Sequence, residues 1–120
     1  MKPGTMFEAG DLVLLPFPFS DLTSTKRRPV LMLTAPDAQG DFVGCPVTSR
    51  AGWMHARPLS PNDMAEGVLP LASWVRTDKI VTLHTGLIAR RFGCVTAGFR
   101  TAIAGDVCCF LDAPPAATGA

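Results

Sequence analysis

The chain has 120 residues, of which 48% are hydrophobic and 18% charged, and its formal net charge is +1. This composition is typical of one globular domain with a real core, and it excludes an intrinsically disordered chain. The near-neutral charge excludes a general electrostatic attraction to nucleic acid, so any anion site must come from local clusters of cations. No apolar stretch reaches the length of a membrane span, and residues 1–10 lack the apolar centre of a signal peptide. We therefore expect a cytoplasmic protein with no membrane partner.

Eleven glycines and eleven prolines divide the sequence into short segments, which is typical of a mainly β or α+β fold. Residues 18–28 are predicted to form a loop, because Ser, Asp and Thr compete with regular backbone pairing there. Residues 50–67 are also predicted to be loop-like, with one helical turn that Ser60 could cap. Apolar runs predict strands at residues 11–17, 29–35, 42–49, 68–77 and 79–85.

The period of the apolar residues changes near the C-terminus. Val95, Phe99, Ile103 and Val107 recur every four residues, which predicts a helix with Thr96 as its N-cap. Gly98 and Gly105 each weaken such a helix by roughly 1 kcal/mol relative to alanine. The sequence contains no linker or internal repeat. We therefore expect a single domain over residues 1–112, built as a barrel-like sheet with a C-terminal helix, and a flexible tail over residues 113–120.

The cysteines and histidines do not form a recognisable metal or nucleophile motif. The two histidines, His55 and His84, have no evident partner in sequence. No G-x-S-x-G elbow and no phosphate-binding glycine loop is present. We therefore predict no metal and no cofactor, and we interpret the cysteines as small residues of the core. The four cysteines are Cys45, Cys94, Cys108 and Cys109.

Polar side chains at the ends of predicted strands are the remaining candidates for chemistry, since a rigid scaffold can hold them beside loops. Arg28 stands directly before an apolar strand, and Thr48 ends another. Arg76 and Asp78 alternate within "WVRTDK", so both side chains point to one face of a strand, about 6.5–7 Å apart. Simpler interpretations also exist: a charged strand edge for Arg28, an ordinary β-favouring residue for Thr48, and a surface ion pair for Arg76 and Asp78.

Together these residue types suit the cleavage of RNA without a metal. In that reaction the ribose 2′-OH attacks the adjacent phosphate. It needs a base, cations around the developing phosphorane, and a proton donor for the departing 5′-oxygen. Arginine can bind phosphate with two hydrogen bonds, and a threonine hydroxyl can hold a phosphate oxygen. DNA, which lacks the 2′-OH, would be inert.

Three segments carry a family resemblance when they are taken in order along the chain. "GDLVLLPFPFSDLTSTKRRPVLMLT", "CPVTS" and "EGVLPLASWVRTDKIVTL" resemble the MazF/PemK-like toxins of type II toxin–antitoxin systems, and the closest similarity is to members with a "PFPFSD" loop. The resemblance runs from about Met6 to about Phe110. It departs from the family in the last third, which is rich in glycine and cysteine where relatives tend to carry a charged amphipathic helix.

The resemblance implies an SH3-like β-barrel of the MazF/CcdB type with a C-terminal helix, acting as a homodimer. It implies a metal-independent, sequence-specific endoribonuclease, or mRNA interferase, that cleaves single-stranded RNA to a 2′,3′-cyclic phosphate. It also implies a cognate antitoxin that occludes the site, with operator DNA as a further partner of the toxin–antitoxin complex.

By position, Arg28 matches the catalytic arginine of the family and Thr48 its catalytic threonine or serine. Arg76 and Asp78 fall where some members place an acid–base pair. Phe17 and Phe19, like Trp53 and Trp74, could stack on bases or anchor a loop on the core. The residues predicted to bind RNA are Phe17, Phe19, Ser20, Lys26, Arg27, Ser49 and Arg50.

Two alternatives from other classes stay open. One is a toxin of the same fold that performs no chemistry and binds a protein such as gyrase; the presence of both Arg28 and Thr48 argues against it. The other is a regulatory member that binds only its antitoxin or operator DNA.

Overall fold

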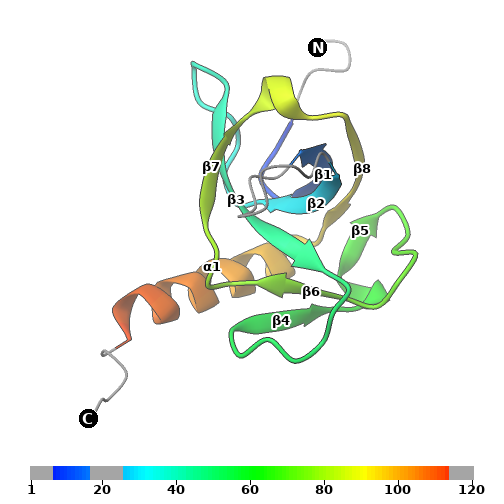
Figure 1. The fold of residues 1–120 in the computed structure, drawn as a ribbon, viewed down its shortest axis with the longest axis vertical. Coiled ribbons are helices and arrows are strands. Elements are labelled where there is room, and N and C mark those ends of the chain that lie inside the picture. The colour runs from blue at the N-terminus through cyan, green and yellow to red at the C-terminus, as the bar shows by residue number, and fades with distance from the viewer. Residues whose placement is uncertain (1–6, 17–25, 114–120) are drawn as a thin grey trace.

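The computed structural model describes residues 7–16 and 26–113. Most of these residues belong to short strands, and one helix follows at the C-terminal end (Figure 1). The elements are β1 (Asp11–Pro16), β2 (Arg27–Met32), β3 (Asp41–Thr48), β4 (Ala56–Leu59), β5 (Met64–Glu66), β6 (Ser73–Arg76), β7 (Val81–His84), β8 (Arg90–Val95) and α1 (Ala97–Asp112), with 3-10 turns at Pro61–Asp63 and Thr85–Leu87.

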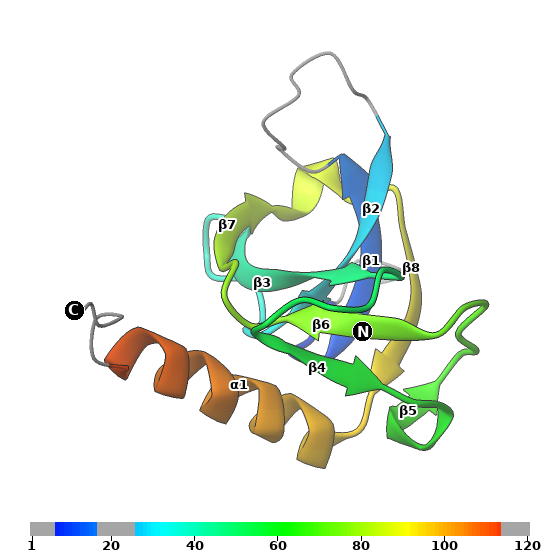
Figure 2. The ribbon, with the colours of Figure 1, turned by 60° about the horizontal axis from the view of Figure 1, so that its bottom comes forward.

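The strands form one sheet in the order β4-β6-β3-β2-β1-β8-β5, and β7 pairs with the first half of β3. Every pairing is antiparallel. The sheet curls into a half-barrel (Figure 1), and α1 runs along the outside of the curl, below β4 and β6 in Figure 2. The predicted fold class, a barrel-like sheet with a C-terminal helix, is confirmed. In the described residues no helix has the length and apolar character needed to cross a membrane.

The two faces of the sheet bury different apolar clusters, because side chains alternate along each strand. One face carries Leu12, Leu31 and Val75, and α1 packs on it through Phe99 and Ile103. The other face is lined by a second cluster that has no contribution from the helix: Val13, Leu15, Val30, Met32, Phe42 and Leu83.

Helix α1 begins where the sequence predicted. The Thr96 hydroxyl accepts a hydrogen bond from the Phe99 N–H at 3.2 Å, which satisfies one of the free donors of the first turn. Gly98 and Gly105 lie on the exposed side of the helix, where a Cβ atom would meet nothing within 4 Å. They therefore weaken the helix only through backbone entropy and leave its packing face intact.

Three strands were not predicted, and one was predicted too long. β4 and β5 lie within the predicted loop of residues 50–67, and β8 was not assigned at all. The predicted strand of residues 68–77 is reduced to β6, because Gly67 adopts a φ of +86° and residues 68–72 form no strand. β8 carries two arginines and a glycine, so its apolar alternation is weak. Its pairing with β1 and β5 is what makes it a strand.

Candidate active site

Arg28 and Thr48 stand at the same end of the paired strands β2 and β3. In that pairing Val30 lies opposite Pro46. The pairing of the two strands ends there, and Arg28 and Thr48 each stand two residues beyond it, at the same end of β2 and β3. Because side chains alternate along a strand, Arg28 is directed to the same face as Val30, and Thr48 to the same face as Pro46. The cation and the hydroxyl, 20 positions apart in the sequence, therefore share one face at adjacent strand ends.

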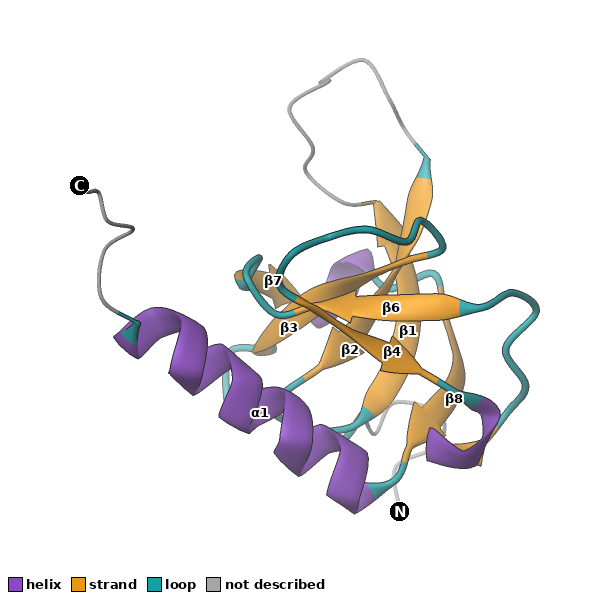
Figure 3. Ribbon diagram, turned by 90° about the horizontal axis from the view of Figure 1, so that it is seen from below, coloured by secondary structure: helices purple, strands orange, loops and turns teal. Residues whose placement is uncertain are grey.

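Arg28 and Thr48 each lie opposite a residue of the strand on their other side. Leu15 of β1 lies opposite Arg28, and Trp74 of β6 lies opposite Thr48. Leu15 is fully buried in the cluster that excludes the helix, while Arg28 is exposed. Arg28 therefore stands where this face of the sheet leaves the core, and it is the face that α1 does not cover. In Figure 3, α1 lies below β3, β4 and β6.

The Thr48 hydroxyl is oriented by the loop that follows it. Its Oγ1 atom accepts a hydrogen bond from the backbone N–H of Arg50 at 3.0 Å. Because this lone pair is occupied, the hydroxyl hydrogen is directed elsewhere and can be donated to a ligand. The side chain is half-buried, so a ligand can reach it from solvent.

Arg76 and Asp78 form a bidentate ion pair near Thr48. The Nε and Nη2 atoms of Arg76 donate to the two carboxylate oxygens of Asp78 at 3.0 and 2.9 Å. The side chains are only 16% and 20% exposed. Hydrogen bonding to Arg76 lowers the pKa of Asp78 below its ordinary value, so this carboxylate stays ionised. Continuing the β3–β6 register places Arg76 opposite Pro46, diagonal to Thr48.

Trp53 completes the surroundings of Arg76. It comes from the loop between β3 and β4, drawn in teal in Figure 3, and its ring lies 3.8 Å from the Arg76 guanidinium carbon. This contact joins residues 23 positions apart, and no local pattern in the sequence signals it. The ring of Trp53 therefore packs on a cation and not into the core, and it is still 42% exposed.

The other predicted RNA-binding residues fall into two groups. Lys26, Arg27, Ser49 and Arg50 are all exposed and lie at the same ends of β2 and β3 as Arg28 and Thr48. Phe17, Phe19 and Ser20 lie outside the described residues.

The interpretation of the cysteines needs a correction. Cys45 is buried in the core as expected, and burial, followed by the nearby negative charge of Asp78, raises its pKa to about 12. Cys94 is only partly buried, and Cys108 and Cys109 are exposed on α1. The four-residue apolar period that predicted α1 places Phe99, Ile103 and Val107 inward, which leaves positions 108 and 109 toward solvent.

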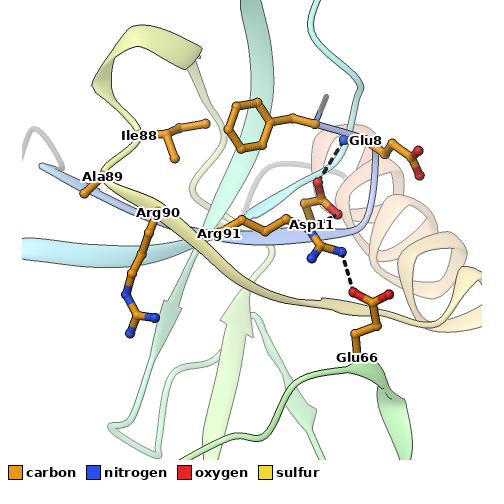
Figure 4. Close-up of a pocket in the computed structure, with 8 residues that line it drawn as sticks. Glu8, Asp11, Glu66, Ile88, Ala89, Arg90 and Arg91 are labelled. Atoms are coloured by element: carbon orange, nitrogen blue, oxygen red, sulfur yellow. Dashed lines mark hydrogen bonds and ion pairs between the residues drawn. The ribbon is translucent and has the colours of Figure 1, made fainter. Parts of the chain in front are cut away.

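A hollow of about 530 Å³ lies elsewhere, between the N-terminal segment, β1, β5 and β8 (Figure 4). Three of its charged residues are already paired with one another: Arg91 contacts Asp11 at 3.0 Å and Glu66 at 2.9 Å, and Asp11 also accepts the backbone N–H of Glu8. The hydrogen bond to Glu66, and then that to Asp11, raise the pKa of Arg91. Arg90 points away from this group in Figure 4, and we do not assign the hollow as the active site.

Comparison with known proteins identifies the family. The family model described as "PemK-like, MazF-like toxin of type II toxin-antitoxin system" matches residues 8–110. The chain belongs to this family. The match covers every strand and nearly all of α1, and it confirms the resemblance found in the sequence. A search of curated proteins by sequence found no match.

Solved structures of MazF toxins have the same fold. MazF from Deinococcus radiodurans is 27% identical, with a TM-score of 0.70, over 88% of this chain and 96% of that chain. A MazE–MazF structure from the same organism is 26% identical, with a TM-score of 0.69, over 89% of this chain and 96% of that chain. The Mycobacterium tuberculosis toxin MazF-mt6 is 20% identical, with a TM-score of 0.64, over 85% and 96% of the two chains, and it supports the fold alone.

Proposed function

We propose that this toxin is a metal-independent endoribonuclease that cleaves single-stranded RNA, with Arg28 and Thr48 at its catalytic centre. The observation that carries the proposal is that Arg28 and Thr48 stand at the same end of two paired strands, where the arginine is exposed and the hydroxyl half-buried. Membership of the MazF/PemK family supports it, since this pair matches the arginine and threonine of the family pattern.

The proposed reaction is a transphosphorylation. The 2′-OH gives up its proton to the solvent as the 2′-oxygen forms a bond to phosphorus. The bond to the 5′-oxygen breaks, and this oxygen takes a proton from the solvent, giving a 2′,3′-cyclic phosphate and a 5′-hydroxyl. Arg28 contacts the non-bridging phosphate oxygens and stabilises the charge that develops on them, and its guanidinium stays charged throughout. The Thr48 hydroxyl, whose oxygen already accepts from Arg50, donates to one of these oxygens.

The predicted acid–base role of Arg76 and Asp78 stays a prediction. Asp78 accepts both hydrogen bonds of Arg76 and its pKa is lowered, which makes it a weak base. The geometry supports a narrower proposal, in which the Arg76–Asp78 pair stabilises the part of the sheet next to Thr48 and places one oriented cation there. Lys26, Arg27, Ser49 and Arg50 would then contact phosphates on either side of the cleaved bond.

We further propose that the chain acts as a homodimer in the cytoplasm and is inhibited by a cognate antitoxin. The MazE–MazF structures from D. radiodurans support an antitoxin partner. Large apolar side chains that are exposed in the isolated chain, such as Val68 at 83% and Leu71 at 62%, also favour an interface with a partner.

The deciding experiment incubates the purified protein with a long synthetic single-stranded RNA in excess EDTA. We expect fragments that end in a 2′,3′-cyclic phosphate, and no cleavage of DNA of the same sequence. Arg28→Ala should abolish cleavage with an unchanged circular dichroism spectrum. Arg90→Ala is the control: it removes the same charge from an exposed position on β8, a strand that carries no residue of the proposed site, and should retain cleavage.

Absence of cleavage by the folded protein on several RNAs of varied sequence would overturn the proposal. Equal activity of Arg28→Ala and the wild type would remove Arg28 from the catalytic centre.

A further inference from the structure

The loop between β3 and β4 presents an aromatic ring next to the proposed catalytic edge. Trp53 lies in this loop, and both ends of the loop are tied to the sheet. At one end Arg50 donates its N–H to Thr48 at 3.0 Å. At the other end the carbonyl of His55 accepts two hydrogen bonds from Thr77, from the backbone N–H at 2.9 Å and from the hydroxyl at 3.2 Å. Since Thr77 is only 4% exposed, this second tie reaches into the buried part of the sheet.

The side chain of Arg76 also supports one face of the Trp53 ring. The Arg76 guanidinium lies 3.8 Å from the ring centroid, and Asp78 fixes that guanidinium with two hydrogen bonds. A cation clamped in this way presents a flat, oriented surface to the indole. Near neutral pH Asp78 stays ionised and keeps its two hydrogen bonds to Arg76, because its pKa is lowered.

The ring keeps a large part of its surface in solvent although one face is occupied. Trp53 is 42% exposed, while Trp74, the other tryptophan, is half-buried within β6. A tryptophan that served only to cover the Arg76–Asp78 pair would gain more by burying both faces. An exposed and rigid aromatic surface is instead the feature that binds unpaired bases, each of which offers a π-face.

We propose that Trp53 is a stacking platform for one base of the single-stranded RNA, beside the phosphate held by Arg28 and Thr48, and that Arg76 and Asp78 position it. This inference rests on the proposed function and deepens it: Trp53 acts on substrate affinity and takes no part in the chemical step. Arg76 lies diagonal to Thr48, about 7–8 Å away in a sheet, so the ring above it lies within reach of a nucleotide next to the cleaved bond.

The test measures binding without cleavage. The probes are 2′-O-methyl oligonucleotides that tile the RNA of the cleavage assay, since they lack the 2′-OH nucleophile. All proteins carry Trp74→Phe, so that the indole of Trp53 is the only tryptophan signal. We expect the fluorescence of Trp53 to be quenched on binding of the tightest oligonucleotide. Trp53→Leu, which keeps an apolar cover over Arg76 but cannot stack, should weaken binding by roughly 5- to 150-fold.

Trp53→Phe should restore most of the affinity, and the melting temperatures of the two variants should agree. Equal affinity of Trp53→Leu and the parent protein, or an unchanged indole signal on binding, would overturn the inference while cleavage by the wild type still upheld the proposed function. Failure of the parent protein to bind any of the oligonucleotides would overturn the inference as well. Loss of cleavage by the wild type would overturn the proposed function itself.

Discussion

Arg76 donates two hydrogen bonds to the carboxylate of Asp78, at 3.0 and 2.9 Å, and both side chains are largely withdrawn from water. Breaking such a pair leaves the remaining partner without its counter-charge, which costs more than the loss of a surface ion pair. The pair therefore stabilises this part of the sheet and also supports the ring of Trp53.

Replacement of Asp78 should change stability in a pH-dependent way. Because hydrogen bonding to Arg76 lowers the pKa of Asp78 from its ordinary 3.8, the contribution of the pair is fully present above that pH and is lost as the pH falls below it. We expect Asp78→Asn to reduce the free energy of unfolding at pH 7 by about 1–3 kcal/mol. Urea unfolding between pH 7 and pH 2 measures the difference, which should shrink at the acid end.

The control for this experiment is Arg76→Lys, which keeps the charge but loses the planar fork. It should be intermediate in stability at pH 7. A difference between Asp78→Asn and the wild type that does not shrink toward pH 2 would show that the ionised pair is not its source.

Thr48 offers a test of the hydroxyl in the proposed chemistry. Thr48→Ala removes a donor to the phosphate oxygens, and we expect kcat to fall by about 10²- to 10³-fold. The same change removes the acceptor of the Arg50 N–H, so the free energy of unfolding should fall by about 1 kcal/mol. Single-turnover cleavage measures the first effect and urea unfolding the second. Thr48→Ser, which keeps the hydroxyl, should restore both; cleavage by Thr48→Ala at the wild-type rate would remove Thr48 from the site.

The cysteines should differ sharply in their reaction with iodoacetamide. The pKa of Cys45 is raised to about 12 by burial, so at pH 8 almost none of it is the reactive thiolate. Cys108 and Cys109 are exposed on α1 and should be alkylated within the same reaction time. Mass spectrometry of tryptic peptides distinguishes the sites. Alkylation of Cys45 only after addition of denaturant would agree with this assignment, whereas alkylation in the native protein would contradict it.

Helix α1 should depend on its buried face and only weakly on its ion pair with the sheet. Ile103 is fully buried, and Ile103→Ala should cost about 2–5 kcal/mol of unfolding free energy. Arg57 contacts Asp106 at 2.7 Å, but their side chains are 42% and 34% exposed, so Arg57→Ala should cost about 0–1 kcal/mol. Urea unfolding of both variants makes the comparison. An equal loss in the two would show that the ion pair carries more of the docking than its exposure indicates.

The sequence by itself determined the elements whose signals are local. The apolar runs behind β1, β2 and β3, and the Thr96 cap with its four-residue apolar period in α1, need no distant partner to be recognised. Arg28 and Thr48 could be chosen in advance because each stands at the end of such a strand, and the family pattern matches both.

The tertiary structure decided everything that depends on which segments meet. β4, β5 and β8 have weak patterns of their own, and pairing with neighbours that already have a buried face makes them strands. The register that directs Arg28 and Thr48 to the same face of β2 and β3 is set by cross-strand packing, since a shift of one residue would turn every side chain to the other face. Trp53 meets Arg76 only because the β3–β4 loop folds back over β6, and a contact between residues so distant leaves no trace in local periodicity.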